Sequence, residues 1–256
     1  MTQLNGKIAL VTGGTKGIGK AIAEKLSNAG AEVAVTARNA PLDNISGHHF
    51  IAADATNPES AAKVAQEIVG KFGKIDIIVN NAGANINPRG GYSTLSDEDW
   101  NNELQLNLMA AVRINKALLP KMISQKNGVI INISTIAAQQ PIGNMTMSYS
   151  ASKAALNAYS KALASEVGTK GIRVNVVSPG LVKTPLMEEF IENMAKTSNI
   201  SFDEAFKNLM DTFNTPLGRM AEPEEVANMV SFLVSPEAEY LTGTNYQVDG
   251  GLMSAI

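Results

Sequence analysis

Short apolar runs rich in β-branched residues alternate with longer segments of helical periodicity along nearly the whole chain. The runs expected to form strands cover residues 7–12, 32–37, 49–53, 76–80, 128–134, 173–178 and 245–248. The expected helices between them cover residues 17–29, 58–72, 97–123, 148–167 and 223–233. Strands that alternate with helices in this way are joined by right-handed crossovers into a parallel sheet with helices on both faces. The pattern therefore predicts an α/β fold with a doubly wound, parallel, seven-stranded sheet in a single domain spanning residues 1–256.

Two stretches depart from this alternation. Residues 38–48 are too few for a covering helix, so this connection is expected to be a loop. At about residues 184–216 two amphipathic stripes predict a small helical insertion, which we call the lid because it would cover a substrate site. Its Met and Phe side chains suit a hydrophobic or elongated substrate, although packing within the core or between subunits explains them equally well. The stripes consist of Met187, Phe190, Ile191 and Met194, and of Phe202, Phe206, Leu209, Met210 and Phe213.

The composition argues against several classes of protein. The 256 residues are 45% hydrophobic and 18% charged, as in a globular protein, and the net charge of −3 offers no basic excess for binding nucleic acid. The chain has no Cys, which rules out disulfides, thiolate–zinc sites and thiol nucleophiles, and no spaced set of His, Asp and Glu suggests a metal. No signal peptide or membrane span is recognisable. These features predict a cytoplasmic protein that binds neither nucleic acid nor membrane.

A glycine-rich turn follows the first predicted strand. Gly13, Gly17 and Gly19 lie where this strand passes into the helix predicted from residue 17. Glycines there allow a tight turn and a close approach of the backbone to a pyrophosphate, whose charge is stabilised by the free N–H groups and dipole of the helix. The spacing differs from G-x-G-x-x-G, and an ordinary glycine-rich turn is the alternative. The order of strand, turn and helix favours a dinucleotide site.

Three further motifs follow the glycine turn in order. They are Asn-Asn-Ala-Gly at residues 80–83, Tyr149-x-x-x-Lys153, and Ser-Pro-Gly at residues 178–180. Together the four motifs resemble those of the short-chain dehydrogenase/reductase family, and the resemblance extends from about residue 7 to residue 251. It implies a Rossmann fold, a nicotinamide cofactor and a homotetramer. Within the family, the chain is most like the 3-oxoacyl-[acyl-carrier-protein] reductases.

Tyr149 and Lys153 are four residues apart, which places them on one face of a helix. A phenol is a poor acid near neutral pH, but a nearby ammonium stabilises the phenolate and lowers the phenol pKa. The resemblance implies that Tyr149 donates a proton to the substrate carbonyl oxygen and that Lys153 also holds the nicotinamide ribose. An isolated Tyr–Lys pair on a helix is usually a pair of surface residues with no catalytic role. The surrounding motifs are what favour catalysis here.

The resemblance also implies a hydroxyl that polarises the carbonyl, and the fifth predicted strand ends with two of them. Alignment on the Asn-x-Ser triplet of the family places Thr135 in this role, although Thr135 lies one residue further from Tyr149 than the family pattern expects. Ser134 is the alternative, because successive strand residues face opposite sides. We favour Thr135. Asn107, in the predicted helix 97–123, matches the family residue that holds a water linking Lys153 to solvent, unless it is only a buried structural Asn.

The end of the second predicted strand indicates which nicotinamide cofactor is used. A site selective for NAD(H) usually has an acid there to bind the ribose 2′-hydroxyl, whereas this strand ends in Ala37-Arg38. Arg38 and Lys16 could pair with a 2′-phosphate, so we expect NADP(H), with two solvated surface cations as the alternative. The other cofactor contacts that the resemblance implies, besides Tyr149 and Lys153, are Gly13, Thr15, Gly17, Ile18, Gly19, Asp54, Ala55, Asn81, Ala82, Gly83, Pro179, Gly180, Val182 and Thr184.

These features predict an NADP-dependent oxidoreductase acting on CH–OH groups. It would reduce a ketone or 3-oxoacyl-type carbonyl to a secondary alcohol, with Tyr149 as the proton donor. The expected partner is a small carbonyl substrate, either free or bound to an acyl carrier. A secondary-alcohol, sugar or steroid dehydrogenase on the same scaffold is the alternative among enzymes. A regulatory protein that senses NADP without turnover is the alternative outside enzymes, and the Tyr149–Lys153 pair argues against it.

Overall fold

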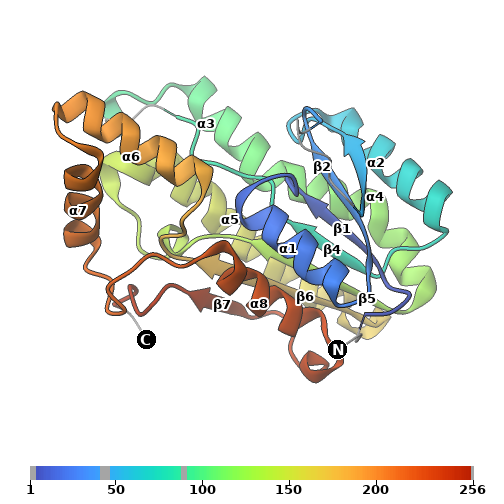
Figure 1. Cartoon of the computed structure of the whole chain (residues 1–256). Helices are drawn as coiled ribbons and strands as arrows, with labels where there is room; N and C mark the ends of the chain where they lie inside the picture. Colours follow the sequence, from blue (N-terminus) through green and yellow to red (C-terminus); the bar gives the residue numbers. More distant parts are fainter. Residues whose placement is uncertain (1–3, 41–46, 88–90, 255–256) are drawn as a thin grey trace.

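The protein is built around one parallel β-sheet. The computed structural model describes residues 4–40, 47–87 and 91–254. These form a seven-stranded sheet with the strand order β3-β2-β1-β4-β5-β6-β7 (Figure 1). The strands are β1 (Ile8–Thr12), β2 (Glu32–Ala37), β3 (His48–Ala52), β4 (Ile77–Asn80), β5 (Gly128–Ile133), β6 (Ile172–Pro179) and β7 (Asn245–Val248). Each predicted strand is therefore confirmed to within about two residues at each end, and the doubly wound Rossmann topology is confirmed with them.

Helices cover both faces of this sheet, as Figure 1 shows. Because successive strand residues face opposite sides, β1 contributes Ala9 and Val11 to one core and Ile8 and Leu10 to the other. The first core lies under α1 and α8, and the second lies under α2, α4 and α5. The bounds of these helices are α1 (Gly17–Asn28), α2 (Pro58–Phe72), α4 (Ala110–Gln125), α5 (Gly143–Val167) and α8 (Pro223–Val234).

The strand order places a crevice at the carboxyl end of β1. The chain continues from β1 to β2 on one side, and β4 pairs with β1 on the other. Helices that leave these two strands cover opposite faces, so their first turns diverge above β1. In an open α/β sheet, ligands bind at this reversal point. The glycine turn and the Asn-Asn-Ala-Gly segment both lie there.

The helix predicted at residues 97–123 is one continuous helical stretch, but it is not uniform. α3 (Asp97–Leu104), a π-helical turn (Gln105–Met109) and α4 follow one another without a break. A π turn holds one more residue per hydrogen-bonded loop than an α turn, and such single turns are frequent at functional sites. Asn107 lies in the middle of it. A hydrophobic pattern of period 3.6 does not reveal one inserted residue.

The predicted start of α5 was wrong by five residues. We expected a helix from residue 148, whereas α5 begins at Gly143. Inside it, Thr146 has a non-helical backbone (φ −134°, ψ 15°), and its hydroxyl hydrogen-bonds the backbone of Ile142. This break interrupts the periodicity of the first turns, and the start has no side-chain cap that the sequence could have signalled.

The two helices of the lid are present as expected. α6 (Pro185–Ser198) and α7 (Phe202–Phe213) follow β6 and lie at one end of the molecule (Figure 1). Of the loop predicted at residues 38–48, residues 41–46 lie outside the described part of the chain. Within the described part, no helix combines the length and apolarity that a bilayer span requires.

Candidate active site

The glycine turn leaves the start of α1 open to an anion. Lys16 is the N-cap of α1, and within the described residues it makes no side-chain capping hydrogen bond. By contrast, the side chain of Asn57 caps the start of α2, and the side chain of Ser96 caps the start of α3. The N–H groups and the positive dipole end of α1 therefore remain available to a phosphate.

Two of the glycines are required by the geometry of this turn. Gly13 has a left-handed backbone with φ +65°, which side chains rarely adopt. A Cβ at Gly19 would collide with the carbonyl oxygen of Gly13. The turn is thus compact enough that a single methyl group would force it apart.

The chain after β4 is fastened to the end of β1. Thr12 Oγ1 accepts hydrogen bonds from the backbone N–H groups of Asn81 and Ala82, both at 3.0 Å. In return, Asn81 Nδ2 donates to the carbonyl oxygens of Thr12 and Gly13. The side chain of Asn81 therefore holds the two predicted cofactor segments together. This structural task is one that the motif alone did not indicate.

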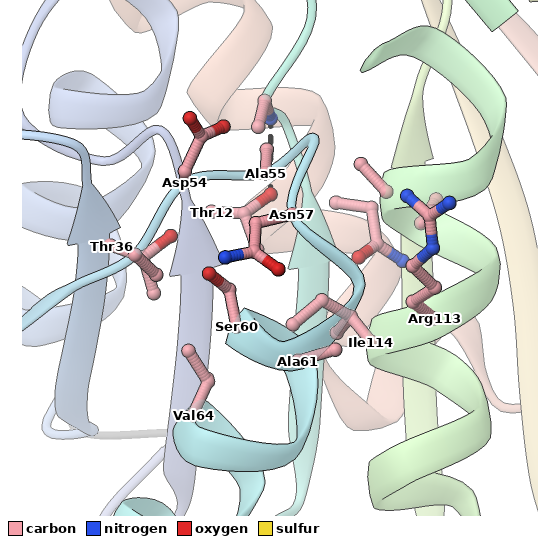
Figure 2. A pocket seen from close by; sticks show the side chains of 15 residues that line it. Thr12, Thr36, Asp54, Ala55, Asn57, Ser60, Ala61, Val64, Arg113 and Ile114 are labelled. Atoms are coloured by element: carbon pink, nitrogen blue, oxygen red, sulfur yellow. Dashed lines mark hydrogen bonds between the residues drawn. The ribbon is translucent and has the colours of Figure 1, made fainter. Parts of the chain in front are cut away.

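A pocket opens at this junction, between the first turns of α2 and the face of α4 (Figure 2). It is small and mainly apolar, which suits a flat aromatic ring. Asp54 lies at its rim, where the backbone and hydroxyl of Thr56 hydrogen-bond its carboxylate and lower its pKa, with a smaller contribution from Arg38. The lining residues are Thr12, Thr36, Ala53, Asp54, Ala55, Asn57, Ser60, Ala61, Val64, Asn80, Ala82, Ala110, Ala111, Arg113 and Ile114.

Arg38 and Lys16 are both exposed at the same end of the sheet. Arg38 directly follows β2, and Lys16 directly precedes α1. Arg38 is close enough to Asp54 to lower the pKa of that carboxyl at the pocket rim. Two cations are thus placed beside an uncapped helix start.

The segment after β6 lies over the glycine turn. A Cβ at Gly17 would be 3.3 Å from Thr184 Cγ2. Thr184 caps α6 by accepting from the Met187 N–H at 3.2 Å, and Val182 forms a β-bridge with Ala221. The Gly180 N–H donates to Val248 O at 3.0 Å. The structure therefore brings Thr184 next to the turn, whereas Gly180 and Val182 are held by Val248 and Ala221.

Tyr149 and Lys153 lie on the inner face of α5. Lys153 is only 3% exposed, and its Nζ donates to Ile133 O at 2.9 Å. Burial lowers the pKa of Lys153 to about 8, against the opposing effect of the Glu103 carboxylate. Tyr149 is half-buried, and the desolvation of its hydroxyl, with a further contribution from Glu103, raises its pKa to about 12. The expectation that Lys153 lowers the pKa of this phenol is therefore wrong for this structure.

The two hydroxyls at the end of β5 have different surroundings. The Thr135 side chain hydrogen-bonds Tyr149 and lowers the pKa of that phenol. Ser134 is 4% exposed, and its Oγ has no hydrogen-bond partner among the described residues. Both residues lie just beyond the end of β5, and Thr135 is the one in contact with Tyr149.

The backbone at Gly83 passes close to two buried side chains, those of Asn107 and Lys153. Asn107 is 2% exposed; its Oδ1 accepts from the Ala84 N–H at 3.0 Å, and its Nδ2 donates to Ala84 O at 2.9 Å. A Cβ at Gly83 would lie 2.7 Å from Asn107 Oδ1 and 2.8 Å from Lys153 Nζ. Only a glycine allows the chain to pass so close to both groups.

Glu103 lies beside these groups, and we did not anticipate it from the sequence. We call Tyr149, Lys153, Asn107 and Glu103 the catalytic corner, after the role proposed for them below. Its side chain is fully buried, and its Oε2 accepts from Asn107 Nδ2 at 2.5 Å. A signal was present: Glu103 and Asn107 share the helix face that continues into the buried Ala110 and Ala111. A carboxylate on a buried helix face needs a partner or a functional explanation, because burying an unpaired charge is costly.

The predicted lid residues do not converge on this corner. Met187, Phe190, Met194, Met210 and Phe213 pack around the core between α6 and α7, which contains Ile191 and Leu209. Much of their apolar surface therefore stabilises the insertion itself. The side chains at the two helix starts, Leu186 and Phe202, are 50% and 43% exposed.

Comparison with known proteins agrees with this geometry. A family model described as enoyl-(acyl carrier protein) reductase matches residues 13–253. The chain belongs to the short-chain dehydrogenase/reductase family. It is 38% identical over 256 residues to 3-oxoacyl-[acyl-carrier-protein] reductase from Escherichia coli strain K12, covering 98% of each chain.

Solved structures of the same fold include enzymes named for sugars. L-sorbose reductase from Gluconobacter frateurii, solved with NADPH and L-sorbose, superposes with a TM-score of 0.92 at 35% identity and full coverage of both chains. Aldohexose dehydrogenase from Thermoplasma acidophilum, in a ligand-free form, gives a TM-score of 0.89 at 31% identity, covering 100% of this chain and 98% of that one. The scaffold of this chain is thus shared by enzymes with different substrates.

Proposed function

We propose that this protein is a ketone reductase that uses NADPH and that Tyr149 is its proton donor. The observation that carries the proposal is the arrangement around the Tyr149 hydroxyl. This hydroxyl hydrogen-bonds Thr135, and the charge of Glu103 acts both on it and on the buried Lys153. The family and the enzyme class, an NADP-dependent oxidoreductase acting on CH–OH groups, agree with the relatives described above.

The residues present fit a nicotinamide dinucleotide phosphate. The uncapped start of α1 would hold the pyrophosphate, the pocket beside Asp54 and Ala55 would hold the adenine, and Arg38 with Lys16 would hold the 2′-phosphate. The missing side chains at Gly13 and Gly83 let the segments that would line the cofactor pack closely, Gly13 against Asn81 and Gly83 against Lys153. When bound, the cofactor supplies the hydride that reaches the carbonyl carbon.

The protonation states favour proton donation near neutral pH. With a pKa of about 12, Tyr149 carries its proton there and can give it to the carbonyl oxygen as negative charge develops. Thr135 would polarise the same oxygen through its hydroxyl. Lys153, with a pKa of about 8, is largely an ammonium and stabilises the phenolate that remains. Asn107 would then hold the water through which the pair recovers its proton.

Two substrate classes are supported by different comparisons. A 3-oxoacyl substrate, free or carrier-bound, is favoured by the sequence relatives named 3-oxoacyl-[acyl-carrier-protein] reductase. A ketose is the second candidate, because L-sorbose reductase matches the chain over its full length at a TM-score of 0.92. We place 3-oxoacyl reduction first.

A panel of carbonyl compounds tests this function. It should contain an acyl thioester, a simple β-ketoester, L-sorbose and a steroid ketone, each assayed with NADPH and with NADH. We expect NADPH oxidation with the thioester and the ketoester. NADPH binding without oxidation on any carbonyl would support the sensor alternative instead, and turnover of L-sorbose alone would select the second candidate.

We also propose a cytoplasmic homotetramer. The strand β7 is at the edge of the sheet, and Tyr240 (fully exposed) and Phe232 of α8 (44% exposed) lie close to it in the chain. An edge strand beside exposed aromatic side chains is a suitable surface for self-association. Light scattering tests it, and a species of 27.0 kDa would contradict it.

A further inference from the structure

Glu103 has no part in the mechanism above, yet it lies at the centre of the catalytic corner. It is the last acid of α3, and its side chain is 0% exposed, whereas Asp97 and Glu98 in the first turn of the same helix are exposed. Burying a carboxylate is costly unless it is paired and hydrogen-bonded. The partners of Glu103 should therefore explain why it is there.

Within the described part of the chain, the groups that hydrogen-bond Glu103 are all donors. Oε1 accepts from the Ile86 N–H at 2.9 Å, Oε2 accepts from Asn107 Nδ2 at 2.5 Å, and the Asn87 N–H also stabilises the carboxylate. A protonated carboxyl would need an acceptor for its own hydrogen, and none of these three groups is one. Burial is the largest effect and raises the pKa of Glu103 above its usual value, although the three donors and Lys153 offset part of that rise. The arrangement is that of an ionised carboxylate.

The charge of Glu103 reaches both members of the catalytic pair. It raises the pKa of Lys153, because an anion favours the ammonium form, and it raises the pKa of Tyr149, because an anion disfavours the phenolate. The elements around Glu103 differ in what they contribute: α5 supplies Lys153 and Tyr149, whereas the segment after β4 and the π turn supply only neutral N–H groups. Among the described residues, Lys153 is the one charged group that acts on Glu103.

We propose that Glu103 is a positioning residue for the Tyr149–Lys153 pair. Its carboxylate fixes the Asn107 amide and the backbone of residues 86 and 87, and its negative charge keeps Lys153 an ammonium and Tyr149 a phenol between turnovers. This proposal rests on the proposed role of Tyr149 as proton donor. Its consequence is that the pH range of reduction extends further into the alkaline region than the pair alone would allow.

The test is the pH profile of kcat/KM for carbonyl reduction by the holoenzyme carrying Glu103→Gln. Without the carboxylate, both Tyr149 and Lys153 lose their protons at lower pH. Whichever loses its proton first, the alkaline limb of the profile should move down by about one pH unit. Glu103→Asp keeps the charge and should leave the limb near its original pH, even where the rate falls. The matched control is Glu98→Gln, an exposed neutralisation on the same helix, which should leave the profile unchanged.

The contrary result is equally clear. If Glu103→Gln lowers the rate by the same factor at every pH, its role is only to hold the fold, and the proposal is overturned. A second measurement does not depend on that variant folding: ¹³C NMR of the native protein labelled at the Glu carboxyl carbons, with Glu103→Asp for assignment. We expect an ionised Glu103 at neutral pH, and a protonated one would also overturn the proposal. Tyr149→Phe distinguishes a failure of the Glu103 proposal from a failure of the proposed function. Full activity in that variant would reject the role of Tyr149 as proton donor.

Discussion

The glycine turn and the catalytic corner lie at the same end of the sheet, but they are built in opposite ways. The turn uses backbone: an uncapped helix start and glycines at positions where a side chain has no room. The corner uses buried side chains, with Glu103, Asn107 and Lys153 all at most 3% exposed. Adding atoms should therefore damage the turn, whereas removing atoms should damage the corner.

The difference follows from what each region must do. A pyrophosphate carries its full charge at all times and needs fixed N–H dipoles, which the backbone provides without desolvating a charged side chain. A proton donor must change its charge during the reaction, so its pKa has to be set by nearby ionisable groups. Gly83 is where the two regions meet, because its missing side chain lets the cofactor segment pass against Asn107 and Lys153.

Removing the Tyr149 hydroxyl should have the largest effect on activity. In Tyr149→Phe the ring remains but the proton donor is lost, and we expect kcat/KM for reduction to fall by about a thousandfold. Binding of NADPH, measured by fluorescence titration, should change little. A variant that keeps more than a tenth of the activity would show that another group supplies the proton.

Substitution of the two hydroxyl residues after β5, Ser134 and Thr135, tests which of them takes part in the reaction. Thr135→Ala removes the group that hydrogen-bonds Tyr149 and should lower kcat by about a hundredfold, as for other groups that stabilise a developing oxyanion. Ser134→Ala removes a buried hydroxyl that has no partner among the described residues, so it should leave both kcat and thermal stability nearly unchanged. Steady-state kinetics of the two variants would decide the matter, and the reverse order of effects would assign the role to Ser134.

Much of this contrast could be predicted from the sequence, because the turn depends on local information. Strand β1, the glycines and α1 follow one another within about twenty residues, and their pattern of apolar residues and glycines determines them. The corner depends on contacts between distant segments. Glu103 is buried because residues 86 and 87 fold over it, and no pattern within α3 shows that approach. The π turn around Asn107 and the early start of α5 were missed for related reasons, since each is an irregularity inside a helix.

Adding one methyl group to the glycine turn tests whether this region lacks room for side-chain atoms. In Gly19→Ala the new Cβ would collide with the Gly13 carbonyl oxygen, and we expect the free energy of unfolding to fall by about 2 kcal/mol. Affinity for NADPH should fall as well. The matched control is Gly70→Ala in α2, where a Cβ meets nothing within 4 Å; there alanine should stabilise the helix by about 0.5–1 kcal/mol. Urea unfolding of both variants measures the difference, and equal stabilities would show that the turn can relax.

The smallest effect is expected where the turn does use side chains, at its exposed cations. Arg38→Ala should lower the preference for NADPH over NADH by about tenfold, because a charge-assisted pair with the 2′-phosphate is lost while solvent and salt screen the site. Activity with NADH should stay nearly constant, since that cofactor has a hydroxyl in place of the phosphate. Lys25→Ala, an equal loss of charge at the far end of α1, is the control and should leave the ratio of the two kcat/KM values unchanged. If Arg38→Ala behaves like this control and Lys16→Ala does too, both are solvated surface cations, and the turn selects its cofactor by backbone alone.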